Sequence, residues 1–129
     1  MPHPLLIPMT AHVALAALLY ALLTIARAPA VWGIGGRADG GNRFAPIEPR
    51  LSANLSNQFE WPVVFHVACV LHVVLGTADA TAVAVAWTFV AGRVLHSAVQ
   101  VGTRDVRLRG LVFMLNFVAA LVLWGLLLR

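Results

Sequence analysis

The chain has 129 residues, of which 60% are hydrophobic and only 11% are charged. Ordinary globular domains carry about a quarter charged residues, so this composition excludes a typical water-soluble domain and indicates a protein surrounded by membrane lipid. All nine basic residues are arginine and the formal net charge is +4, but no basic run with interleaved aromatic residues is present, which argues against a nucleic-acid partner.

The first apolar segment predicts a helix over about residues 10–34. A cleavable signal peptide is the alternative, because residues 28–30 (Ala-Pro-Ala) look loosely like a small-residue cleavage site. The region before the apolar run has His3 but no Lys or Arg, and the run is long for a signal peptide, so we expect the helix to be retained. Arg27 near its end can extend to the membrane interface or turn inward toward the other helices.

Residues 35–56 are rich in Gly, Pro, Arg and Asn, which predicts a long connection before a second helix at about 57–76. About 20 residues at about 1.5 Å each just span a bilayer core of about 30 Å. Asn57 and Glu60 lie near the start of this helix, where an acidic side chain stabilises the positive end of the helix dipole. Their simplest interpretation is therefore helix-start chemistry.

The second helix also carries two histidines and the only cysteine. His66 and His72 are six residues apart, which places them roughly 120° apart around a helix, so they do not point together as metal ligands. Cys69 stands alone among apolar neighbours and offers neither a disulfide nor a metal site within the chain. We expect no metal and a buried, inert thiol.

A short turn leads to a third helix at about 80–101, and a fourth follows at about 110–128. Arg93, His96 and Gln100 interrupt the apolar third helix at positions i, i+3 and i+7, within roughly 60° of one another. Such a polar stripe inside a membrane usually faces the bundle interior or a wet cavity and marks a functional site. The sequence thus predicts an all-α, integral membrane four-helix bundle.

The arginines of the connections predict the orientation. The first and third connections carry Arg37, Arg43 and Arg50, and Arg104, Arg107 and Arg109, respectively, whereas the second has no basic residue. By the positive-inside rule the first and third connections face the cytoplasm, and both termini lie on the opposite side. We expect a multi-pass protein of a bacterial inner membrane.

Arg93 lies deep in its helix and needs a partner there. Glu60 is the only carboxylate inside a predicted span, so pairing it with Arg93 or Arg109 across helices would reduce the desolvation cost of both charges. Such a pair could serve catalysis or could simply hold the bundle together.

Two motifs resemble one known family, the membrane-associated proteins in eicosanoid and glutathione metabolism (MAPEG). The run Arg50, Asn57, Glu60, Pro62, Phe65 resembles the family's second-helix signature, although the Pro is shifted by one. The spacing of Arg93, His96, Gln100 and Arg109 resembles the third-helix stretch of the microsomal prostaglandin E synthase type, and the match covers most of the chain.

This resemblance implies a homotrimer that binds glutathione between neighbouring subunits at the cytoplasmic side. It makes Arg109 the catalytic residue that stabilises the thiolate, and makes Asn57 and Glu60 ligands of the glutathione backbone. The other implied glutathione-binding residues are Arg50, Arg93, His96, Gln100 and Phe113. The chain departs from the family pattern at Ser56, where related members have Arg, at Gln100 and Phe113, where they have Tyr, and at Gly110, where they have Ser.

Two functions follow as hypotheses. The first is a glutathione transferase or peroxidase that acts on a small lipophilic electrophile. The alternative is a non-catalytic membrane protein of the same fold that binds a lipid or a protein partner. An ion or proton pathway through Arg93, His96 and His72 is a third reading, but the spans contain too few acidic residues for it.

Overall fold

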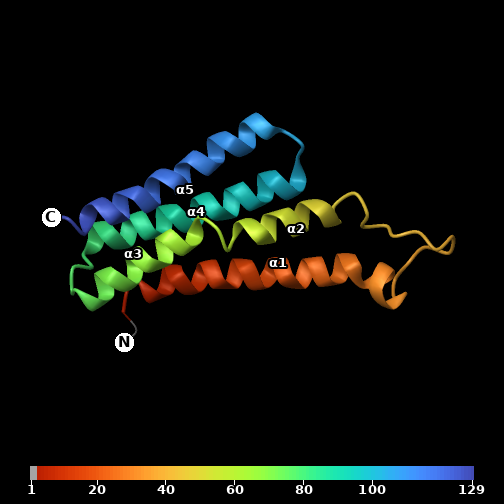
Figure 1. The fold of residues 1–129 in the computed structure, drawn as a ribbon, viewed down its shortest axis with the longest axis horizontal. Coiled ribbons are helices and arrows are strands. Elements are labelled where there is room, and N and C mark those ends of the chain that lie inside the picture. The colour runs from red at the N-terminus through yellow and green to blue at the C-terminus, as the bar shows by residue number, and fades with distance from the viewer. Residues whose placement is uncertain (1–2) are drawn as a thin grey trace.

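The computed structural model describes residues 3–129, which form five α-helices and no strand. The helices are α1 (Leu6–Trp32), α2 (Glu48–Asn57), α3 (Pro62–Val74), α4 (Ala80–Gly102) and α5 (Val106–Leu126). Helices α2 and α3 follow one another as a single interrupted rod, so the chain forms an elongated bundle of four rods (Figure 1). The predicted all-α bundle is confirmed.

Three of the helices, α1, α4 and α5, are long and apolar enough to cross a membrane. Their most apolar stretches of 18 residues have mean hydropathies of 2.0, 1.5 and 1.9, and large apolar side chains such as Val13, Leu95 and Leu111 remain exposed on the outside of the bundle. Exposed apolar surface of this extent is stable in lipid and costly in water. The protein is therefore an integral membrane protein.

The second rod differs from the helix predicted over about 57–76. It begins at Glu48, because the stretch around Pro49 forms the first turn of α2, a position where proline is well tolerated. The connection from α1 is correspondingly shorter than the predicted 35–56. Its Gly- and Pro-rich composition indicated a loop correctly up to residue 47, but the following polar residues form a helix that packs against α1 and α4.

The break in this rod lies between Gln58 and Trp61. Pro62 starts α3 and has no N–H to donate to the preceding turn, so the helix cannot run through it. Just before it, the Gln58 N–H donates to the Leu55 carbonyl three residues back, at 3.0 Å, and the next residue repeats this pattern. These tighter turns change the direction of the side chains between Gln58 and Pro62.

Aspartate caps fix the starts of the last two helices. Asp79 accepts a hydrogen bond from the Ala82 N–H at 2.8 Å and begins α4 where the sequence predicted. Asp105 accepts from the Arg107 and Leu108 N–H groups at 2.9 and 3.0 Å, so α5 begins at Val106 instead of about 110. Arg109 therefore lies in the first turns of α5.

Two apolar clusters fill the bundle. Near the termini, the rings of Phe65 and Phe89 stack with centroids 4.0 Å apart and an interplanar angle of 4°. Near the long connection, a second cluster contains Leu19, Leu23, Ala26, Leu51 and Leu55. Between these clusters along the chain lie buried polar side chains, which are His12 on α1, Gln58 in the α2–α3 rod, and Arg93, His96 and Ser97 on α4. The bundle thus contains a polar layer between two apolar ones.

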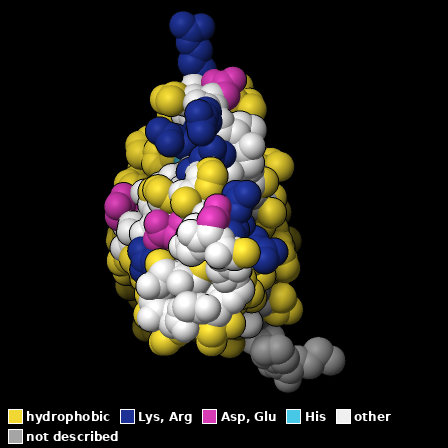
Figure 2. Space-filling view, turned by 90° about the vertical axis from the view of Figure 1, so that its right-hand side faces the viewer, with side chains coloured by type: hydrophobic (Ala, Val, Ile, Leu, Met, Phe, Trp, Pro, Cys, Tyr) yellow, Lys and Arg dark blue, Asp and Glu magenta, His cyan; other side chains and the backbone are white. Residues whose placement is uncertain are grey.

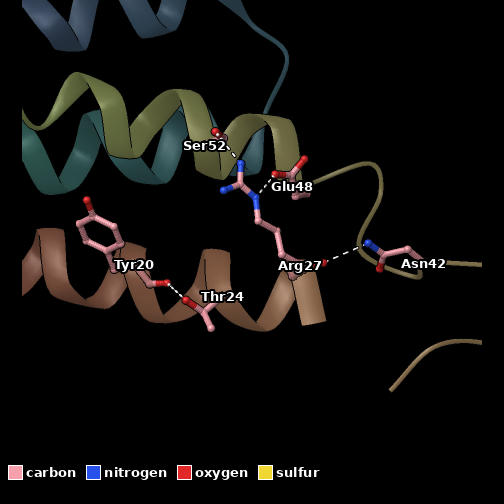
Figure 3. Close-up of polar contacts among 7 residues, drawn as sticks. Tyr20, Thr24, Arg27, Asn42, Glu48 and Ser52 are labelled. Carbon is pink, nitrogen blue, oxygen red and sulfur yellow. Dashed lines mark hydrogen bonds and ion pairs between the residues drawn. The ribbon is translucent and has the colours of Figure 1, made fainter. Parts of the chain in front are cut away.

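Contacts between α1 and α2 hold the end of the bundle that carries the long connection (Figure 3). The Arg27 Nε donates to Glu48 Oε1 at 2.6 Å, and its Nη2 donates to Ser52 Oγ at 3.2 Å. Asn42 donates its amide to the Ala26 carbonyl at 3.0 Å. Of the two positions open to Arg27, the structure shows the one directed toward a neighbouring helix.

Charged side chains gather at this same end. Figure 2 looks onto it and shows arginine and acidic side chains across the face, with hydrophobic side chains covering the flanks. The connections α1–α2 and α4–α5 both lie here, and the two termini lie at the opposite end (Figure 1). Both arginine-rich connections therefore lie on the same side of the bundle.

Candidate functional site

Arg93 is the centre of the polar layer and is only 1% exposed. Its Nε donates to Gln58 Oε1 at 3.2 Å, and its Nη2 donates to the Asn57 carbonyl at 3.0 Å. The expected pair with Glu60 is absent, since that carboxylate is exposed and forms no ion pair with any residue in the range 3–129. The break before Pro62 brings the Gln58 amide to Arg93 instead.

Gln58 connects three helices through its amide. Its Oε1 accepts from Arg93 and also lies 3.0 Å from Nε2 of His12 on α1. Its Nε2 donates to the carbonyl and to Oδ1 of Asn54, both at 3.2 Å, and lies 3.2 Å from Ser97 Oγ. With 2% of its surface exposed, Gln58 satisfies polar groups that would otherwise be buried without partners.

The donors and acceptors in this network follow from Arg93, which can only donate. The atom of Gln58 that meets Arg93 must be the amide oxygen, so Nε2 of His12 donates to that oxygen. A neutral His12 then has an accepting Nδ1, which lies 3.0 Å from Nε2 of His66. His66 therefore donates through Nε2 and keeps Nδ1 as a free acceptor nitrogen of its ring.

Gln100 extends the network toward the charged end of the bundle. Its Oε1 accepts from Asn54 Nδ2 at 2.8 Å and from Asn57 Nδ2 at 3.1 Å. The predicted inward face of α4 is thereby observed, because Arg93, His96 and Gln100 are all buried. Two of the predicted glutathione ligands, Asn57 and Gln100, contact each other directly.

An arginine-lined cavity of about 250 Å³ opens next to Gln100, between α2 and the α4–α5 connection. Arg50 and Arg109 both line it, and Arg50 donates through Nη1 to the Val101 carbonyl at 3.2 Å. Neither arginine forms an ion pair with any residue of the described chain. The remaining lining residues are Pro49, Ala53, Val99, Thr103, Arg104 and Asp105.

His96 and Phe113 lie beside each other on the facing sides of α4 and α5. Their ring centroids are 5.8 Å apart at 63°, an edge-to-face contact. His96 is 3% exposed, and its Nδ1 is buried without a hydrogen-bond partner in the described part of the chain. Such a nitrogen is costly unless a ligand or water reaches it.

The structure brings only some of the predicted site residues together. Arg50, Gln100 and Arg109 line one cavity, and Asn57 meets it through Gln100. Glu60 points to the outside, beyond the lining of that cavity.

Four residues of the network were missed by the sequence analysis: His12, Asn54, Gln58 and Ser97. All four are polar residues that the structure buries. A polar residue inside an apolar segment was the pattern that identified Arg93. His12 stands in the first apolar segment and could have been identified in the same way.

Comparison with known proteins gives one match. The model of the MAPEG family matches residues 5–129, which is almost the entire chain. No curated protein and no solved structure matches.

Proposed function

Because this chain belongs to the MAPEG family, whose members are membrane proteins of eicosanoid and glutathione metabolism, we propose that it is a glutathione-dependent transferase or peroxidase acting on lipophilic electrophiles. The observation that carries this proposal is the cavity lined by Arg50 and Arg109, which lies at the charged end of a membrane bundle and adjoins a buried polar layer.

The charge of this cavity fits the chemistry of glutathione. The tripeptide carries two carboxylates, one amino group and a thiol, and arginine guanidinium groups bind carboxylates through paired hydrogen bonds. Arg50 and Arg104, which both line the cavity, would bind the carboxylates.

Arg109 is proposed to stabilise the thiolate. It is half-buried at the boundary between the cavity and the apolar bundle. A guanidinium beside a thiol lowers the pKa of that thiol and increases the fraction of nucleophilic thiolate at neutral pH. The solvent-side thiol and a membrane-dissolved electrophile could meet at this residue.

Two reactions would follow from the thiolate. With an aryl halide, the sulfur attacks the ring carbon, a C–S bond forms and halide leaves with the C–X bonding pair. With a lipid hydroperoxide, the sulfur attacks the terminal peroxide oxygen, which yields an alcohol and a sulfenic acid of glutathione. A second glutathione then displaces water and leaves the oxidised disulfide, so two thiols are consumed per peroxide.

Glu60 supports a site shared between subunits. It is exposed on the single chain, yet the family pattern makes it a ligand of the glutathione amino group. A neighbouring subunit packed against this face would bring Glu60 close to a bound ligand, as in the homotrimer that the family implies. Native mass spectrometry in mild detergent should then show a trimer, and a stable monomer or dimer would contradict this arrangement.

We also propose that the charged end faces the cytoplasm of a bacterial inner membrane. The connections α1–α2 and α4–α5 carry the arginines at that end, which supports the positive-inside orientation. Glutathione would then enter from the cytoplasm.

The decisive experiment compares two arginines in the first turns of α5. Arg109→Ala should lower glutathione-dependent turnover of an aryl halide by roughly 10- to 1000-fold, the range for loss of one charge-stabilising donor. Arg107→Ala is the matched control, since this residue is exposed and does not line the cavity. It should retain nearly full activity.

Other outcomes would reject the proposal. Equal, small losses in both variants would show that Arg109 does not stabilise the thiolate. A parent protein without thiol-dependent turnover on aryl halides or hydroperoxides would favour the non-catalytic function, in which the same fold binds a lipid or protein partner.

A further inference from the structure

A second cavity, of about 290 Å³, lies between α1 and the break in the α2–α3 rod. It shares no lining residue with the arginine-lined cavity. His12, Gln58 and His66 form its polar part, and its apolar part contains Val13, Ala16, Ala17, Tyr20, Phe59 and Val63. This volume is at the small end of the range for ligand pockets, about 300–1,000 Å³, so the occupant is a small molecule and not a whole lipid.

The cavity opens at the apolar outer surface of the single chain. Val13, Tyr20, Phe59 and Val63 are between 51% and 57% exposed, and α1 is a membrane-spanning helix. An occupant would therefore enter from the bilayer and would itself be lipophilic. An anionic occupant is disfavoured, because the lining contains no arginine.

The polar part of the cavity offers an acceptor to an occupant that carries a hydrogen-bond donor. The chain of hydrogen bonds from Arg93 through Gln58 and His12 makes His66 a donor through Nε2, at 3.0 Å from His12. Its Nδ1 is then an acceptor, and no residue in the range 3–129 donates to it. A ketone or ester cannot fill this role because neither has an O–H or N–H group.

Aromatic side chains form one wall of the cavity. The Tyr20 and Phe59 rings meet edge to face with centroids 6.2 Å apart, and Tyr20 rises from α1 toward α2 (Figure 3). An aromatic occupant would gain edge-to-face or stacked contacts with these rings. A saturated alcohol would lack that contribution.

We propose that this cavity binds a small membrane-dissolved phenol, whose hydroxyl donates to Nδ1 of His66 and whose ring packs against Tyr20 and Phe59. The occupant would thereby be linked to Arg93 through the hydrogen bonds of His12 and Gln58. This proposal is independent of glutathione, because the two cavities are separate and binding requires no thiol.

The test uses the full chain in lipid nanodiscs without thiol. A 4-alkylphenol bearing a diazirine is photo-crosslinked and the labelled residues are mapped by mass spectrometry. Unlabelled 4-propylphenol and its methyl ether, 4-propylanisole, compete at equal concentrations in the bilayer. We expect labels on α1 and around Phe59, and competition by the phenol at roughly fivefold lower concentration, the effect of one net hydrogen bond.

Three variants test separately the hydrogen bond to His66, the free volume of the cavity, and labelling at an unrelated groove. His66→Phe should remove the preference for phenol over anisole. Ala17→Phe should abolish labelling by filling the cavity while leaving the hydrogen-bond network in place. Val118→Phe is the control, because it fills a groove on the opposite α4–α5 face and should change nothing.

Several results would overturn the proposal. Equal competition by phenol and anisole, or an unchanged preference in His66→Phe, would show that no hydroxyl is recognised. Labels confined to other surfaces would place the phenol elsewhere. Absence of any label, together with crosslinking of Ala17→Cys between two copies, would show that a second chain covers the cavity.

Discussion

Replacing Gln58 with leucine should strongly destabilise the fold, because the Gln58 amide joins three helices. The variant keeps the approximate volume but removes the oxygen that accepts from Arg93 and His12. One buried charged donor and one buried neutral donor would lose a partner, and the amide donors to Asn54 and Ser97 would also be lost. We expect a loss of about 3 to 5 kcal/mol in the free energy of unfolding.

The assay is unfolding in mixed micelles of dodecyl maltoside and SDS, followed by tryptophan fluorescence. Gln58→Glu retains the acceptor beside Arg93 but places its second carboxylate oxygen against the two Asn54 oxygens, so it should cost less than Gln58→Leu and more than the control below. Ser56→Leu, at an exposed position in α2, is the control and should lie within about 0.5 kcal/mol of the parent. If Gln58→Leu is as mild as this control, or if the leucine and glutamate variants lose equal stability, the acceptor argument is refuted.

Three further predictions concern other sites. Gly92→Ala should lower the free energy of unfolding by about 1 to 3 kcal/mol in the same assay, because its Cβ would lie 3.1 Å from the Asn116 backbone nitrogen. Gly125→Ala is the control, because its Cβ would meet nothing within 4 Å and should not destabilise the fold. Backbone hydrogen bonding lowers the pKa of the Asp79 carboxyl group. The cap should therefore contribute its whole stabilising free energy near neutral pH and lose it as the pH falls through the lowered pKa. Thermal melts of Asp79→Asn at the same pH values should not show this loss. Glu60→Gln should change the unfolding free energy of the ligand-free protein by no more than about 0.5 kcal/mol, and a loss above 2 kcal/mol would reveal a buried partner.

The membrane bundle and the inward face of α4 were predictable from the sequence. Apolar runs of membrane-spanning length predict helices by themselves, and the spacing of Arg93, His96 and Gln100 fixes a common face without knowledge of any neighbour. The start of the third helix, predicted at about 80 after a short turn, also agrees with the structure. These are local properties, so the sequence alone determines them.

The partner of Arg93 could not be predicted in this way. The expectation of Glu60 assumed one continuous helix and chose the only carboxylate within it. In the structure the chain breaks before Pro62, and the amide of Gln58 reaches Arg93 while Glu60 remains exposed. The contact between Gln58 and Arg93 depends on the turn geometry of the break and on packing against His12, which is distant in the sequence. A local sequence pattern holds no information about either.

The residues of the arginine-lined cavity were predicted only in part. Arg50 and Arg109 were singled out through the family resemblance, and both line the cavity. Asp105 was not, because a residue between two helices looks like an ordinary cap from sequence alone. Its position beside Arg104 and Thr103 results from the tight α4–α5 connection.

Direct binding of glutathione tests the central claim most simply. Isothermal titration of the parent protein in lipid nanodiscs should show saturable binding of glutathione, competition by S-hexylglutathione, and a marked loss of affinity in Arg50→Ala with none in Arg107→Ala. No saturable heat with either ligand at millimolar concentration, in a protein shown to be folded, would contradict the proposal that this cavity is a glutathione site.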